Sequence, residues 1–224
     1  MRQFAARAAL FSLAAGLALI GSSLAQSSIP DILKQTQTNL EKSPWQATVI
    51  GEFKMGSSTQ EAEIGLQVIP GADAIMRLEF KKPEPMADNF TVLTKKEVWT
   101  YLFVSNQIVI EARAKAKLNE LVQQIAGLGD MNSLEDQFNL KLEGEASTQG
   151  GAAWKLSGTP KKPGQRYASV EVLILKTDPR PLTMTLKDSD GKPMGTLEIR
   201  DFKRAALIAV NLKKYPRDAT VVRK

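Results

Sequence analysis

The sequence predicts an α+β fold, in which a strongly curved antiparallel sheet carries helices on one of its faces. Segments that alternate apolar and polar residues recur between residues 45 and 212, and turn-forming residues separate them. These segments are interrupted once, near the middle of the chain, by apolar residues at helical spacing. Alternation with a period of two indicates strands that are covered on one face and wet on the other.

The first residues have the pattern of a secretory signal. Arg2 and Arg7 precede an apolar run over residues 8–20, and small residues follow up to Ala25. The apolar run is shorter than the roughly 20 residues of a membrane span, which argues against an uncleaved anchor. We therefore expect residues 1–25 to be a signal peptide cleaved before Gln26, and residues 26–224 to form a single domain that is exported to the periplasm or the cell exterior.

The composition excludes several enzyme classes. The chain contains no histidine and no cysteine, so it can form no Ser-His-Asp triad, no histidine metal site and no thiolate nucleophile or disulfide. It has a net charge of +6 at pH 7, and its basic residues do not gather into one long stripe. We therefore expect no cofactor, no metal and no nucleic-acid partner, while weak attraction to an anionic membrane or an acidic partner stays open.

The order of the elements follows from periodicity and turn signals. A short amphipathic helix is expected over residues 30–42, because Pro30 suits its first turn and Ser43-Pro44 ends it. The expected strands cover residues 45–55, 62–68, 74–80, 90–94, 97–104, 107–111, 138–146, 152–158, 169–176, 182–187, 196–203 and 207–212. The strand over residues 97–104 is apolar on both faces, which indicates cover on both sides.

The central helix is expected over residues 112–128, and it would supply cover for the inner face of the sheet. Its apolar residues form one stripe at spacings of three and four, and Gly127 and Gly129 end it. The stripe consists of Leu118, Leu121, Val122, Ile125 and Leu128. A further helical turn is expected over residues 133–137.

Acidic residues give only a weak case for catalysis. Glu61, Glu63 and Asp88 could serve a carboxylate-dependent hydrolase, but Glu61 and Glu63 are two residues apart on the polar face of a strand, where they would face water. The run Asp188-Ser189-Asp190-Gly191 resembles the opening of a calcium loop without the closing glutamate, and we interpret it as a turn.

Two further features have a plain and a functional interpretation. The basic loop with Lys161, Lys162 and Arg166 could dock an acidic partner or a membrane, or simply be solvated. Six methionines follow the expected signal, and methionine adapts well to irregular apolar ligands. Among them we expect Met76 and Met184 to face such a ligand, with core filling as the alternative.

Several stretches, taken in order, resemble the periplasmic outer-membrane lipoprotein carriers, the LolA-like proteins. These stretches are Met76-Arg77-Leu78-Glu79-Phe80 before Pro83, Leu93 to Tyr101, Asn106-Gln107-Ile108, and the tail from Val210 to Val222. The resemblance implies an incomplete antiparallel β-barrel whose concave apolar surface is closed by helices. The arginine beside a proline that tethers the lid in that family has no counterpart, which leaves Arg77 as the substitute candidate.

The resemblance also implies a function. The chain would be a monomeric carrier, without enzymatic activity, that holds acyl chains of lipoproteins or lipids and moves them from an inner-membrane donor to an outer-membrane acceptor. The implied acyl cavity comprises Phe53, Leu66, Met76, Leu78, Phe80, Trp99, Tyr101 and Met184, and the implied lid comprises Leu118, Leu121, Val122 and Ile125. The alternative is a lipid- or lipoprotein-sensing regulatory module of the cell envelope, which we rank second because such regulators resemble this domain but carry an extra C-terminal domain.

Overall fold

The structure, a computed structural model, describes residues 27–55 and 58–224. The expected signal peptide lies outside these described residues. No helix within the described ranges is both long and apolar enough to cross a membrane.

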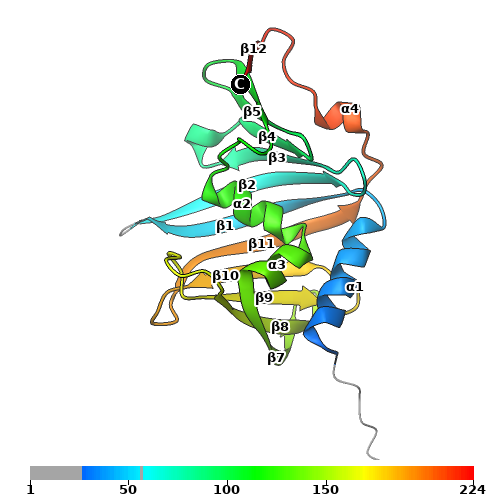
Figure 1. Cartoon of the computed structure of the whole chain (residues 1–224), viewed down its shortest axis with the longest axis vertical. Helices are drawn as coiled ribbons and strands as arrows, with labels where there is room; N and C mark the ends of the chain where they lie inside the picture. Colours follow the sequence, from blue (N-terminus) through cyan, green and yellow to red (C-terminus); the bar gives the residue numbers. More distant parts are fainter. Residues whose placement is uncertain (1–26, 56–57) are drawn as a thin grey trace, which may run out of the picture.

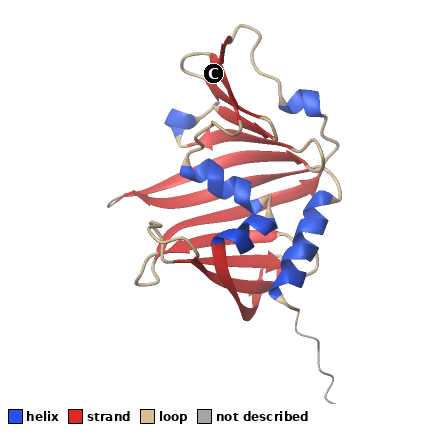
Figure 2. Ribbon diagram, in the orientation of Figure 1, coloured by secondary structure: helices blue, strands red, loops and turns tan. Residues whose placement is uncertain are grey.

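The described residues form one twelve-stranded sheet, in the order β12-β6-β5-β4-β3-β2-β1-β11-β10-β9-β8-β7. The strands are β1 (Trp45–Met55), β2 (Ser58–Ile69), β3 (Ile75–Lys82), β4 (Phe90–Thr94), β5 (Glu97–Leu102), β6 (Gln107–Ala112), β7 (Phe138–Thr148), β8 (Gly151–Pro160), β9 (Ser169–Leu175), β10 (Pro181–Lys187), β11 (Pro193–Arg204) and β12 (Thr220–Arg223). All neighbouring pairs are antiparallel except β12 and β6, which run parallel. The sheet curves without closing, which confirms the predicted α+β fold with an incomplete barrel (Figure 2).

Three helices lie across one face of this sheet, which we call the inner face (Figure 1). They are α1 (Ile29–Glu41), α2 (Glu120–Leu128) and α3 (Met131–Gln137), and two short turns, η1 (Glu84–Met86) and α4 (Ala209–Leu212), complete the helical elements of the described residues. Ser28 caps α1, and the Gln37 side chain of α1 accepts a hydrogen bond of 2.9 Å from the backbone N–H of Met131 in α3. The main hydrophobic core lies between these helices and the inner face.

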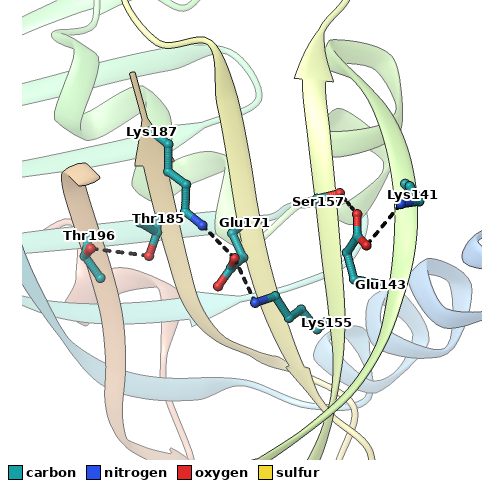
Figure 3. Close-up of polar contacts among 8 residues, drawn as sticks. All are labelled: Lys141, Glu143, Lys155, Ser157, Glu171, Thr185, Lys187 and Thr196. Atoms are coloured by element: carbon teal, nitrogen blue, oxygen red, sulfur yellow. Dashed lines mark hydrogen bonds and ion pairs between the residues drawn. The ribbon is translucent and has the colours of Figure 1, made fainter. Parts of the chain in front are cut away.

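The opposite, outer face is polar where β7 to β11 form it. Figure 3 shows Glu171 between two cations, with its carboxylate 2.8 Å from Lys187 Nζ and 3.0 Å from Lys155 Nζ. Partial burial raises the pKa of Glu171, but hydrogen bonds from Lys187 and Lys155 outweigh burial, so the net pKa lies below its ordinary value of 4.5. A face built from such cross-strand ion pairs is suited to water, so the apolar face of this half of the sheet is the inner one.

The outer face carries a cluster of apolar side chains where β3 to β6 form it, and there the C-terminal segment, residues 205–219, covers it. A second core joins side chains of these strands to this segment. Its members are Ile75, Phe90, Val92, Tyr101, Ile108, Ile110, Leu212 and Ala219, with Ile69, Trp99, Leu207 and Tyr215 packed against them. This segment explains why β5 is apolar on both faces. Val98 faces the main core, whereas Trp99 and Tyr101 face the second core.

Arg77 of β3 holds the C-terminal segment in place. Its guanidinium donates hydrogen bonds of 2.9 Å to the backbone oxygens of both Leu212 and Lys214, and it stacks 3.8 Å from the centre of the Phe90 ring. Arg77 therefore lies on the outer face, away from α2. The expectation that it tethers the lid was wrong, because its position in β3 gives it the same orientation as Ile75 rather than that of Met76.

Several predicted boundaries also differ from the structure. The central helix begins at Glu120 rather than at residue 112, because the Asn119 side chain accepts a hydrogen bond of 2.8 Å from the Val122 N–H and caps the helix there. Residues 207–212, predicted as a strand, contain the short helix α4 instead. The strand predicted over residues 97–104 ends at Leu102, and β12 was not predicted as a strand.

Candidate apolar ligand site

A pocket of about 350 Å³ lies on the inner face, between α2 and the strands β1, β2, β10 and β11. Most of its exposed lining is apolar. The lining residues are Phe53, Gln60, Glu61, Ala62, Pro83, Met86, Asn119, Leu121, Gln124, Arg166, Tyr167, Leu186, Met194 and Gly195. This volume is at the lower end of the range found for small-molecule sites, and the preponderance of apolar walls is typical of them.

Two glycines make room for the floor of the pocket. Phe53 of β1 is paired with Gly195 of β11, and its ring also lies over Gly51 of its own strand. A methyl group at Gly51 would come within 2.5 Å of Phe53 Cε2, and one at Gly195 within 2.8 Å of Phe53 Cδ1. The ring therefore lies against the backbone of the sheet, which keeps the space above it open.

The helix α2 divides its side chains between the core and the pocket. Val122, Ile125 and Leu128 are buried in the main core, whereas Leu121 is partly exposed and lines the pocket. The C-terminal end of α2 approaches the sheet closely, since a methyl group at Gly129 would lie 2.9 Å from Met76 Cε. The helix is therefore packed on the sheet at one edge and borders an open space at the other.

A second hollow of about 540 Å³ adjoins the first. The two share Gln124, Arg166, Tyr167 and Leu186 in their linings, and the second extends past α3 and the loop that follows β8. Its lining is about equally polar and apolar, with Met184 and Phe138 among the apolar members and Lys162 and Asp136 among the charged ones. An elongated ligand could thus have an apolar portion in the first hollow and a more polar portion in the second.

The predicted cavity residues fall into three groups in the structure. Phe53 and Leu121 line the first pocket, and Met184 lines the second. Leu66, Leu78, Phe80, Val122 and Ile125 belong to the main core beneath or within α2, with Met76 and Leu118 packed against it. The structure thus brings ten of the twelve predicted residues to the helix-covered side of the sheet.

Trp99 and Tyr101 do not belong to this site, and the expectation that they line the cavity was wrong. Both belong to the second core on the outer face, where the Trp99 ring lies 6.0 Å from that of Tyr215 and the Tyr101 hydroxyl contacts Asn106. The physical reason is that β5 has apolar residues of both parities, so alternation alone does not show which parity faces inward.

Sequence reasoning missed several of the lining residues, among them Ala62, Met86, Leu186 and Met194. Met86 and Met194 were among the six methionines, and their place in a Pro-rich connection and beside a turn gave no reason to prefer them. Pockets formed where loops meet strand ends leave no periodic pattern, so methionine itself was the one available signal.

The two glutamates considered for catalysis are engaged in surface ion pairs. Glu61 lies 3.4 Å from Lys82 Nζ, and Glu63 lies 3.3 Å from Lys81 Nζ. In the part of the chain that the structure describes, no group of three His, Cys, Asp or Glu residues could hold a metal ion. The described site offers apolar surface with a polar rim, which suits binding by exclusion of water.

Comparisons with known proteins give a family and a fold without giving an activity. A family model described only as "Uncharacterized protein" matches residues 73–215. An uncharacterized conserved protein from Thermus thermophilus is 38% identical, with a TM-score of 0.68 over 88% of this chain and 100% of that one. No curated protein matches the chain.

More distant structures share the fold. MucB of Pseudomonas aeruginosa, solved in complex with MucA, is 18% identical with a TM-score of 0.57, and the match covers 88% of this chain but 64% of MucB. The neighbours also include a LolA superfamily protein from Nitrosomonas europaea, at 12% identity and a TM-score of 0.44 over 84% of this chain and 99% of that one.

Proposed function

The chain belongs to the family of uncharacterized proteins whose model matches residues 73–215, and we propose that it is a soluble periplasmic carrier that holds acyl chains of lipoproteins or lipids. The observation that supports this most is the apolar pocket of about 350 Å³ bordered by a helix that contributes Leu121 to its wall. The signal-like pattern of residues 1–25 supports export as part of the same proposal.

A carrier must offer its cargo a pocket about as apolar as the membrane interior that the acyl chain leaves. Each methylene exposed to water costs about 0.8 kcal/mol, so a long acyl chain does not leave a membrane without an apolar receptor. A sheet wall and the Leu121 side of α2 supply many weak, non-directional contacts, which bind without a chemical step. Release then requires only that the two sides of the pocket close on each other.

The helix α2 would act as the movable wall. The pocket is small for a complete long acyl chain, so full occupancy calls for α2 to shift away from the sheet. Cargo would then compete with the packing of Val122 and Ile125 on the sheet. The free energy of binding would be the difference between the packing of the acyl chain in the opened pocket and the packing of α2 on the sheet in the empty protein. A small difference is what a protein that must pass its cargo on requires.

The experiment is a titration of purified protein with a fluorescent fatty acid, accompanied by native mass spectrometry of protein from its own compartment. We expect a bound lipid mass, and a probe affinity that Leu121→Asp lowers at least tenfold. The matched control is Leu102→Asp, because Leu102 is 40% exposed at the end of β5 and lies outside the pocket. Equal affinities for the wild type and Leu121→Asp would contradict the proposal.

A second candidate function is a regulatory module that senses lipids or lipoproteins and binds a membrane protein. The fold similarity to MucB, which was solved in complex with MucA, favours it. Transfer of a labelled lipid between two vesicle populations distinguishes the candidates. A carrier increases the transfer rate in proportion to its concentration, whereas a sensor binds lipid and leaves the transfer rate unchanged.

A further inference from the structure

The C-terminal segment carries a surface that the acyl pocket does not use. We call it the C-terminal patch and define it by Ile208, Val210, Lys213, Lys214 and Arg217. Ile208 and Val210 are 60% and 65% exposed, although both are large and apolar. Val210 and the three cations line one hollow together with Trp99 and Tyr215.

We propose that the C-terminal patch docks the protein on an anionic membrane surface. The patch combines three features that interfacial segments share: exposed aliphatic side chains, neighbouring cations, and aromatic rings at their boundary. Lys213 Nζ lies 5.8 Å from the centre of the Trp99 ring, which in turn contacts Tyr215 edge to face. Lys and Arg side chains can bring their charges to headgroups while their aliphatic stems lie along apolar surface.

Charge in the patch is available to a partner. Lys214 and Arg217 are exposed and make no ion pair with the described residues. Of the carboxylates near the patch, Asp218 accepts a hydrogen bond of 3.0 Å from Asn106, and Glu97 accepts one of 2.8 Å from Trp99 Nε1. By contrast, the two cations at the end of β12 are paired within the chain, Arg223 with Glu97 and Lys224 with Glu111. The excess of positive charge favours an anionic surface over a neutral one.

The patch is also held rigidly enough to act as a unit. Arg77 binds the backbone oxygens of Leu212 and Lys214 from the sheet side, so the side chains of the segment are presented outward from a fixed backbone. The patch and the acyl pocket are on opposite faces of the sheet. Membrane docking therefore goes beyond the proposed carrier function and does not require it.

The test is partitioning onto phosphatidylglycerol-containing vesicles, with pure phosphatidylcholine vesicles as the neutral comparison. We expect binding to the anionic vesicles that weakens with added salt. Neutralising two charges in Lys214→Gln/Arg217→Gln should weaken partitioning about 25-fold, since each cation near the surface contributes a factor of about five. The matched control, Lys34→Gln/Lys42→Gln, removes the same charge from exposed positions in and directly after α1, which covers the inner face, and should change partitioning less than about twofold.

Two further measurements locate the contact. Ile208→Ser/Val210→Ser should weaken binding to anionic vesicles even at constant charge, because it removes the exposed aliphatic groups. Trp45 and Trp154 are buried, so a blue shift of tryptophan emission on vesicle binding should come from Trp99 and be lost in Trp99→Phe.

Leu121→Asp should partition like the wild type, which separates docking from acyl binding. Absence of binding to anionic vesicles, or an equal loss in the Lys34/Lys42 control, would overturn the proposal.

Discussion

The ring of Phe53 in β1 lies against Gly195 in β11, its direct cross-strand partner, so closely that a methyl group at Gly195 would come within 2.8 Å of Phe53 Cδ1. This contact sets the depth of the pocket, because the ring can lie along the sheet only where the partner has no side chain. The size of the proposed ligand site therefore depends on the missing side chain of Gly195, which is itself part of the lining.

The first prediction concerns that glycine. Gly195→Ala should push the Phe53 ring into the pocket and weaken binding of a fluorescent fatty acid about fourfold or more, the equivalent of one lost methylene contact. Gly65→Ala is the matched control. Gly65 lies in β2, outside the pocket lining, and a methyl group there would be 3.8 Å from its nearest neighbour, Glu79 Cβ. Unchanged probe affinity in folded Gly195→Ala would contradict the role given to Phe53.

The second prediction separates the two sides of α2. Ile125 is fully buried in the main core, so Ile125→Ala should lower the free energy of unfolding by about 2–5 kcal/mol. Leu121→Ala should cost less than half as much, because Leu121 is partly exposed at the pocket, while weakening probe binding. Urea denaturation and probe titration of both variants measure this, and equal stability losses would show that α2 has no pocket side.

The third prediction concerns Arg77. Arg77→Met should leave the backbone oxygens of Leu212 and Lys214 without their donor, and we expect a loss of about 1–3 kcal/mol in unfolding free energy. Hydrogen exchange should rise over residues 205–219, while α2 keeps its protection. The control is Arg200→Met, whose cation is exposed and pairs with Glu198 at 2.6 Å, and it should leave stability essentially unchanged. Faster exchange in α2 than in the C-terminal segment would restore Arg77 as a lid tether.

The fourth prediction follows from the lowered pKa of Glu171. A carboxylate whose pKa is lower in the folded protein than in the unfolded chain binds fewer protons when folded, so its contribution to stability is complete above the ordinary pKa of 4.5 and is lost as the pH falls below it. The melting temperature should therefore drop as the pH is lowered from about 5. Glu171→Gln should be less stable at neutral pH and show a shallower drop. A wild-type curve of the same slope as that of Glu171→Gln would refute this assignment.

How far the sequence predicts this fold depends on whether a pattern is local. Strands such as β2 and β9 and the end of α2 at Gly129 were predicted, because alternation and glycine stops are properties of neighbouring residues. The parallel pairing of β12 with β6 joins segments far apart in the chain, and so short a strand carries too little pattern to predict it.

The candidate site shows the same division. Phe53, Leu121 and Met184 could be found because each belongs to the apolar parity of a regular element. Trp99 and Tyr101 could not be assigned to a face, because the cover on the outer side comes from the distant segment 205–219. That segment resembled a strand over residues 207–212, and its conformation depends on contacts with Arg77 that only the fold creates.

The most direct test of the central claim is photo-crosslinking with a fatty acid that carries a diazirine near its methyl end, followed by peptide mapping. If the hollow under α2 holds acyl chains, the label should be found on residues that line it, chiefly Phe53, Leu121, Leu186 and Met194, and excess unlabelled fatty acid should suppress it. Labelling concentrated instead at Trp99 and Tyr215, or spread evenly over the surface, would show that acyl chains do not enter the hollow.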